Sequence, residues 1–172
     1  MRKFNRILKR LLKQIKRLIA TDDYLKLLKY IIFLLKKNKE IEENKLAGGI
    51  NNLKLEKFPA KRGEIFLVDF GYNIGTEFRY MHYCVVLKVN RYMATVLPLT
   101  SKNKNNLTTI NLGVINKLGS NINSYGLLNQ IRSISRARLI RPTINGNRAF
   151  IKLSANQLNI IDNELKIFFN LT

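Results

Sequence analysis

The chain has 172 residues, of which 46% are hydrophobic, so it can hold one domain with a packed core plus an appendage, and global disorder is excluded. Its 31 Lys and Arg residues against 11 Asp and Glu give a net charge of +20. Such a charge favours polyanionic partners: nucleic acid is the first candidate, an acidic protein the second and an anionic membrane surface the third.

Residues 1–20 predict a basic amphipathic helix, because the apolar side chains recur at helical spacings with basic residues between them. The apolar set is Phe4, Ile7, Leu8, Leu11, Leu12, Ile15, Leu18 and Ile19. No acidic residue interrupts the segment. Thr21, Asp22 and Asp23 then offer N-cap oxygens for a second helix from Tyr24 to Asn38. That helix is apolar over most of its surface and is expected to be buried against the first helix, the main domain or a second copy of the chain.

Residues 1–38 are therefore predicted to form a basic amphipathic helical hairpin that extends a separate domain. Three interpretations of this extension remain open: a packing element with a solvated basic face, a site for nucleic acid or an acidic partner, and a membrane-surface helix. Residues 39–60 are polar and contain Gly48, Gly49 and Pro59, which indicates a linker before a domain at 61–172.

From residue 61 the pattern changes to short apolar runs closed by polar residues, which predicts strands near 64–70, 82–90 and 93–100, with a hairpin at 90–92. A polar, basic loop at 101–106 and a longer loop at 113–125 flank a further strand at 107–112. Three more strands are expected at 125–134, 137–141 and 148–152, with an Asn145-Gly146 turn before the last. Ser154 and Gln157 form a capping box that opens a terminal helix. This order predicts a small antiparallel barrel with a covering helix.

Several classes of site are excluded. The single cysteine, Cys84, cannot form an internal disulfide and lies in an apolar run, where a buried thiol is expected. The single histidine, His82, cannot build a two-histidine metal site within one chain, and no Cys/His cluster has zinc-ligand spacing. No phosphate-binding glycine motif is present. We expect no cofactor and no metal.

The longest apolar run, residues 30–35, is far shorter than the ~20 residues of a spanning helix. The N-terminal apolar residues are dispersed among charges, unlike those of a signal peptide. We therefore expect a cytoplasmic protein, for which a membrane is the least expected partner.

Five short motifs in residues 60–170 occur in the order found in the PemK/MazF family of bacterial toxins, which this part of the chain resembles. They are Arg62-Gly63-Glu64-Ile65, Gly75-Thr76-Glu77, Val85-Val86-Leu87, Pro98-Leu99-Thr100-Ser101, and Asn129-Gln130-Ile131-Arg132-Ser133-Ile134 followed by Arg138-Leu139. Nothing in the resemblance covers residues 1–50.

The resemblance implies an SH3-like antiparallel barrel that dimerises. It implies the toxin of a type II toxin–antitoxin system, held inactive by an acidic antitoxin. Most members are metal-independent endoribonucleases that cut single-stranded RNA at short sequences: a ribose 2′-hydroxyl attacks the adjacent phosphorus and the 5′-oxygen leaves. That reaction needs a base, an acid and donors for the developing charge.

The same resemblance implies the site residues. The family usually has Arg-Pro where this chain has His82 and Tyr83, so His82 inherits the position of a catalytic arginine; histidine can act as acid, base or phosphate ligand. Thr100 matches the family's catalytic threonine, and Thr76 and Glu77 are candidates to assist His82. The residue before Gln130 is commonly acidic in the family and is Asn129 here, so this chain lacks one possible acid. Candidate RNA-binding residues are Arg79, Tyr80, Ser101, Lys102, Lys104, Gln130 and Arg132.

Two other functions remain open. A barrel of the same fold could bind nucleic acid by charge without cleaving it, and the change to His82 and Tyr83 favours this. Related toxins of this fold poison gyrase, but those resemble one another in a C-terminal tail containing Trp, and this chain has no Trp.

Overall fold

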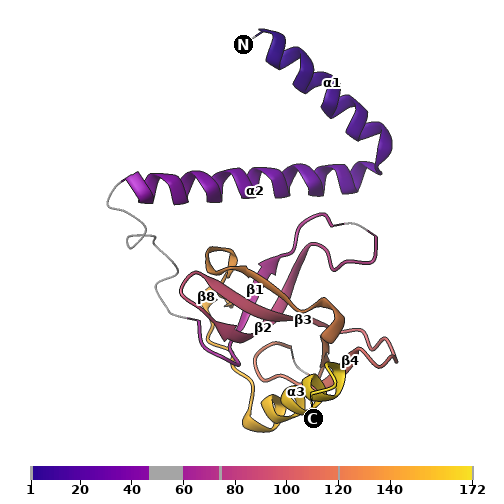
Figure 1. The fold of residues 1–172 in the computed structure, drawn as a ribbon, viewed down its shortest axis with the longest axis vertical. Helices are drawn as coiled ribbons and strands as arrows, with labels where there is room; N and C mark the ends of the chain where they lie inside the picture. The colour runs from indigo at the N-terminus through magenta and orange to yellow at the C-terminus, as the bar shows by residue number, and fades with distance from the viewer. Residues whose placement is uncertain (1, 47–59, 74, 120, 172) are drawn as a thin grey trace. The chain divides into compact units, whose positions relative to one another are not determined.

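The computed structural model describes residues 2–46, 60–73, 75–119 and 121–171. The chain forms two compact units, residues 1–53 and 54–172. In the first, helix α1 (Arg2–Leu18) is followed by helix α2 (Thr21–Leu46) (Figure 1). No helix in the described part of the chain is long and apolar enough to span a membrane.

Helix α2 is longer than predicted. It begins at Thr21, before the expected Tyr24, with Asp22 and Asp23 in its first turn, where carboxylates interact favourably with the helix dipole. It continues past Asn38 to Leu46, so the first part of the predicted linker is helical. None of the α2 side chains that the structure describes is buried within the first unit, so α1 by itself does not bury this helix.

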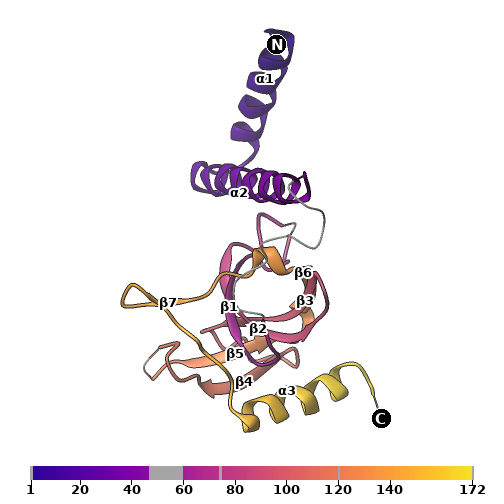
Figure 2. The same ribbon diagram turned by 90° about the vertical axis from the view of Figure 1, so that its left-hand side faces the viewer.

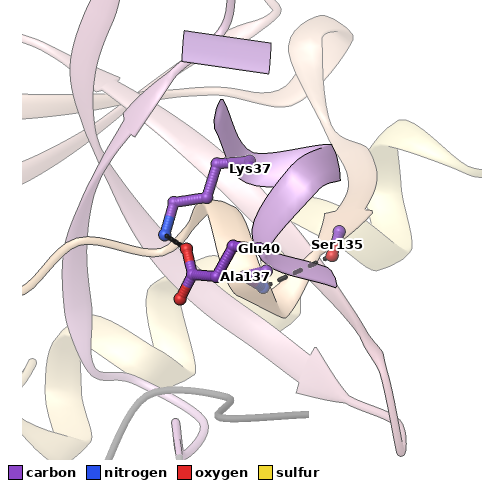
Figure 3. Close-up of polar contacts among 4 residues, drawn as sticks. All are labelled: Lys37, Glu40, Ser135 and Ala137. Atoms are coloured by element: carbon purple, nitrogen blue, oxygen red, sulfur yellow. Dashed lines mark hydrogen bonds and ion pairs between the residues drawn. The ribbon is translucent and has the colours of Figure 1, made fainter. Parts of the chain in front are cut away.

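Charge pairs explain the extra turns of α2. Lys37 Nζ lies 3.1 Å from Glu40 Oε2 (Figure 3), and Lys39 Nζ lies 3.6 Å from Glu43 Oε1. Lysine and glutamate are good helix formers, and pairs three or four residues apart stabilise a helix. The glycines and proline that indicated a linker lie at 48–59, outside the described residues.

The second unit contains an antiparallel sheet in the order β1-β2-β3-β5-β4, with β6 also paired to β3 (Figure 2). The strands are β1 (Ile65–Asp69), β2 (Met81–Val89), β3 (Met93–Thr100), β4 (Thr109–Val114), β5 (Asn123–Leu127) and β6 (Arg132–Ser135). The first three strands confirm the predicted ones, and Asn90 N–H donates to the carbonyl of Met93 across the expected hairpin.

The predicted class, a mainly antiparallel sheet with helices, is confirmed, but the sheet is not closed into a barrel. β3 shares its second edge between β6, which pairs with Met93–Val96, and β5, which pairs with Leu99 and Thr100. Among the described residues, isolated bridges meet the outer side of β1 and of the residue before it, from Leu67 to Ile140 and from Glu64 to Lys152. These contacts cover the edge of β1 without joining it to β4.

The core lies on both faces of the sheet because successive strand residues point to opposite sides. One cluster contains Ile65, Val85 and Leu97, and the other contains Phe66, Cys84 and Val96. Cys84 is buried, as expected, and burial raises the pKa of its thiol.

Helix α3 (Ala155–Phe168) covers the first cluster with its buried Ile161. The predicted capping box is confirmed: the Ser154 hydroxyl accepts from Gln157 N–H, and the Gln157 side chain accepts from Ser154 N–H. Gln157 Nε2 also donates to the carbonyls of Leu112 and Val114, which lie on edge strand β4. One residue thus caps the helix and ties it to the sheet.

The segment after β5 departs furthest from the sequence prediction. The strand expected at 125–134 is split by a 3-10 turn, η2 (Leu128–Gln130). The strand expected at 137–141 is wrong, because a second 3-10 turn, η3 (Arg136–Arg138), starts where Ser135 Oγ accepts from Ala137 N–H (Figure 3). β7 (Thr143–Ile144) and β8 (Asn147–Arg148) flank the predicted Asn145-Gly146 turn, so the strand expected at 148–152 is reduced to a short pairing.

Candidate active site

A cavity of about 530 Å³ opens where β2 begins and β3 ends, and we call it the β2–β3 cavity. The strand ends, the 101–104 loop and the segment leading into β5 all contribute to it. It is lined by Leu67, Phe78, Met81, His82, Tyr83, Leu99, Thr100, Ser101, Lys102, Lys104, Leu118, Gly119, Ile122 and Ser124. None of these described lining residues is acidic, so a negatively charged ligand would meet no repulsion from them.

Strand register brings His82 and Thr100 into this cavity. Cys84 on β2 pairs with Pro98 on β3 in antiparallel register. His82 precedes Cys84 by two residues and Thr100 follows Pro98 by two. Both residues therefore lie at the same end of the β2–β3 strand pair and on the same face of the sheet. His82 is also fixed from the other side, because it pairs with Val68 of β1.

The imidazole of His82 is packed against an aromatic ring. Its centroid lies 4.1 Å from that of Phe78, with the two planes tilted by 38°. Burial lowers the pKa of His82, and a hydrogen bond with the backbone of Arg79 acts in the opposite direction without cancelling the effect. A histidine whose pKa is below its usual value of about 6.5 is neutral at pH 7 and can accept a proton.

The hydroxyl of Thr100 is held by its own loop. Its Oγ1 accepts from the backbone N–H of Lys102 at 3.1 Å, which turns the chain after β3. An oxygen that accepts in this way keeps its own O–H available as a donor. The exposed Lys102 and Lys104 follow directly. The cavity therefore combines the imidazole of His82, several hydroxyl groups including that of Thr100, and two cationic side chains.

Gln130 supports the residue that stacks on His82. Its Oε1 accepts from the backbone N–H of Phe78 at 2.9 Å and from Arg132 Nη2 at 3.1 Å. Asn73 Nδ2 donates to the carbonyl of Phe78 at 2.7 Å. The Arg132 guanidinium lies 5.4 Å from the ring centroid of Phe70, and neither Gln130 nor Arg132 lines the cavity. Both residues therefore contact residues next to the cavity, Gln130 through Phe78 and Arg132 through Gln130 and Phe70.

Four other predicted site residues lie on the loop between β1 and β2, away from the cavity lining. Thr76 and Glu77 are exposed and do not line the cavity, so the structure does not bring them together with His82 and Thr100. Arg79 Nη2 donates to the carbonyl of Gly75. Tyr80 has a positive φ of 65°, and its backbone bonds to Phe70 and Gly71 close the loop.

Sequence reasoning missed part of the apolar wall of the cavity. Leu118, Gly119 and Ile122 belong to a segment that glycine and asparagine content marked only as a loop. Tyr83 and Met81 also line the cavity, although neither was a candidate. Their position beside His82 at the start of a strand was the available signal, because a twisted strand end exposes both of its faces.

Comparisons with known proteins support a family assignment for the second unit. The sequence profile of the PemK-like, MazF-like toxins of type II toxin–antitoxin systems matches residues 61–169. MazF (Form-I) from Deinococcus radiodurans is similar in structure with a TM-score of 0.50 and 17% identity, covering 67% of this chain and 100% of that one. A MazE–MazF (Form-II) structure from the same organism has a TM-score of 0.48 and 17% identity, covering 68% and 100%. No curated protein matches the sequence.

Proposed function

The chain belongs to the PemK-like, MazF-like toxins of type II toxin–antitoxin systems, and from this premise we propose that it is an endoribonuclease that cuts single-stranded RNA without a metal. One observation carries the proposal: His82 and Thr100, from two different strands, line the same cavity together with Lys102 and Lys104. Neither strand alone would place an imidazole, a hydroxyl and two ammonium groups around one ligand.

In the proposed reaction, neutral His82 accepts the proton of a ribose 2′-hydroxyl. The 2′-oxygen attacks the adjacent phosphorus, and the bond from phosphorus to the 5′-oxygen breaks, leaving a cyclic phosphate and a 5′-hydroxyl. Thr100 donates its O–H to a phosphoryl oxygen. Lys102 and Lys104 stabilise the phosphorane charge, and a lysine ammonium of this loop protonates the departing oxygen. Preorganised donors of this kind often contribute the largest share of catalysis.

Recognition of RNA would use the apolar part of the cavity. Tyr83 and Phe78 offer ring surfaces for an unpaired base, while duplex RNA hides its bases in the stack. The charge of +20 adds an attraction to phosphates that does not depend on sequence. We therefore propose single-stranded RNA as the substrate, with Ser101, Lys102 and Lys104 beside the scissile phosphate.

We further propose that the toxin is a homodimer and that its antitoxin is acidic. A toxin of charge +20 attracts a partner of opposite charge, and the approach of the two is accelerated electrostatically. Size-exclusion chromatography with light scattering tests the dimer: a mass of about twice 20.0 kDa is expected. A mass equal to that of one chain would contradict it.

The decisive experiment incubates purified protein with single-stranded RNA in EDTA and analyses the ends of the fragments. We expect fragments that carry a cyclic phosphate and a 5′-hydroxyl. A matched substrate with 2′-O-methyl groups should bind and stay intact, because it lacks the nucleophile. Binding of both RNAs without cleavage of either would favour the non-catalytic binder, and absence of binding would contradict an RNA substrate altogether.

A further inference from the structure

The two faces of α1 are completely separated in chemical character. At about 100° per residue, the helical positions of its seven apolar residues (Phe4, Ile7, Leu8, Leu11, Leu12, Ile15 and Leu18) fall within an arc of about 140°. Its eight Lys and Arg residues fall within an opposite arc of about 140°, and Asn5 and Gln14 occupy the two borders. The helix contains no acidic residue.

Most of the apolar arc of α1 is exposed within the first unit. Ile7 is 50% exposed, Leu8 43%, Leu11 49% and Leu18 83%. Leu12 and Ile15 are half-buried, and no described α1 side chain is buried. Contiguous exposed apolar residues of this kind mark an interaction surface. The family match begins at residue 61, so the toxin domain supplies no assignment for this helix.

Any occupant must satisfy an apolar face and a cationic face at once. RNA would contact the basic arc and leave the leucines and isoleucines in water. A groove on an acidic protein would take the apolar arc, but the centre of the basic arc would then point away from it. An anionic bilayer avoids both problems, since the apolar arc can enter the lipid while the surface potential reaches charges all around the helix.

Dimensions agree with a bilayer. A helix of 17 residues is about 26 Å long, and its diameter of about 10 Å is close to one Debye length at physiological salt, so charges on the far side still feel the membrane. Long Lys and Arg stems at the borders can also extend to the lipid phosphates. Strong segregation with many basic residues and low overall hydrophobicity is typical of helices that lie in the interface.

We propose that α1 binds the surface of an anionic lipid bilayer, lying in its plane with Leu8 and Leu11 inserted among the acyl chains. Helix α2 does not share the property, because Asp22, Asp23, Glu40, Glu42 and Glu43 interrupt its cationic character. The sequence pattern alone placed a membrane-surface helix behind a packing element. The exposed apolar arc reverses that order, since α2, the other helix of the first unit, leaves most of it exposed.

Sedimentation of the full chain with vesicles tests the proposal. We expect binding to vesicles of equal parts phosphatidylcholine and phosphatidylglycerol, and much weaker binding to phosphatidylcholine alone. The double variant Leu8→Asn, Leu11→Asn keeps the charge of +20 and removes the two side chains proposed to enter the acyl chains. Its affinity should fall by about 100-fold, or about tenfold per leucine. The double variant Lys9→Gln, Lys13→Gln should lose about fivefold per charge.

Leu107→Asn is the matched control, because Leu107 is 97% exposed but lies in the second unit. It should leave vesicle binding unchanged, and circular dichroism should show that all variants remain folded. A wild-type chain that ignores anionic vesicles would overturn the proposal, as would a leucine variant that binds them normally. An equal loss of binding to 2′-O-methyl RNA or to polyglutamate in the leucine variant would also overturn it, because α1 would then bind that polyanion.

Discussion

The PemK/MazF resemblance assigns residues of the β2–β3 cavity and of the loop between β1 and β2 to one site, but the structure places only some of them in the cavity lining. His82 and Thr100 occupy strand ends whose positions follow from backbone pairing. Thr76 and Glu77 are exposed on the loop and neither lines the cavity, whereas Phe78 of the same loop stacks on His82 and lines it. Strand register therefore places His82 and Thr100 in one cavity although they are distant in the sequence, whereas Thr76 and Glu77 lie only a few residues before His82 and are outside the cavity lining.

The largest expected effect comes from removing the imidazole. His82→Ala should reduce cleavage of single-stranded RNA by about 10²- to 10⁴-fold, the range for loss of acid–base catalysis. Fragment yield over time measures the rate, and thermal melting shows whether the variant is folded. Wild-type cleavage by a folded His82→Ala chain would remove histidine from the mechanism and leave the cavity without a base.

Thr100→Val should cost about 10²-fold, because the isosteric side chain loses the O–H that stabilises the phosphorane. Thr100→Ser retains a hydroxyl and should recover most of the rate. The comparison needs kcat separately from KM, since a donor that acts only in the transition state changes kcat. Equal rates for the serine and valine variants would indicate that Thr100 only caps the turn at Lys102.

The cleavage rate should depend on pH through His82. Burial lowers the pKa of His82, so the base form is complete at neutral pH and the rate should fall about tenfold per pH unit only below that pKa, itself below about 6.5. The unfolded chain binds a proton more readily than the folded one in this window. The free energy of unfolding should therefore decrease as the pH falls below about 6.5. His82→Gln should lack this contribution in a urea titration.

Gln130 offers a smaller effect that links the two regions. Gln130→Met removes the acceptor of Phe78 N–H and Arg132 Nη2, which costs about 1–3 kcal/mol when donors are left unpaired. We expect a modest loss of stability and a drop of about tenfold in kcat, as the ring stacked on His82 loosens. Gln130→Glu keeps an acceptor and should retain more of both. If Gln130 positions the ring beside His82, the Gln130→Met variant should also shift the acid side of the pH–rate profile for cleavage. Simple destabilisation of the fold would leave that profile unchanged.

The smallest expected effects are those of Glu77→Gln and Thr76→Val. Both side chains are exposed and outside the cavity lining. Surface substitutions of this kind usually change stability by no more than about 0.5 kcal/mol, and cleavage should stay within about twofold of wild type. A loss of more than tenfold for Glu77→Gln would show that the loop closes over bound RNA, and the distinction between the two regions would fail.

Local sequence alone determined several parts of this protein. Alternating apolar residues define the first three strands, and Ser154 with Gln157 defines the start of α3. The segregation of α1 into two faces follows from residue spacing. These features depend on neighbours within a few positions, whose side-chain directions are set by the period of the helix or strand.

Only the tertiary structure decided that the sheet stays open, that residues 136–138 form a 3-10 turn, and that His82 and Thr100 share a cavity without Thr76 and Glu77. Each depends on partners distant in the chain: β3 divides its edge between β5 and β6, and Gln130 reaches Phe78 across 52 residues. Such pairings depend on how the whole core packs, and residue spacing along the chain does not show which of the possible pairings is most stable.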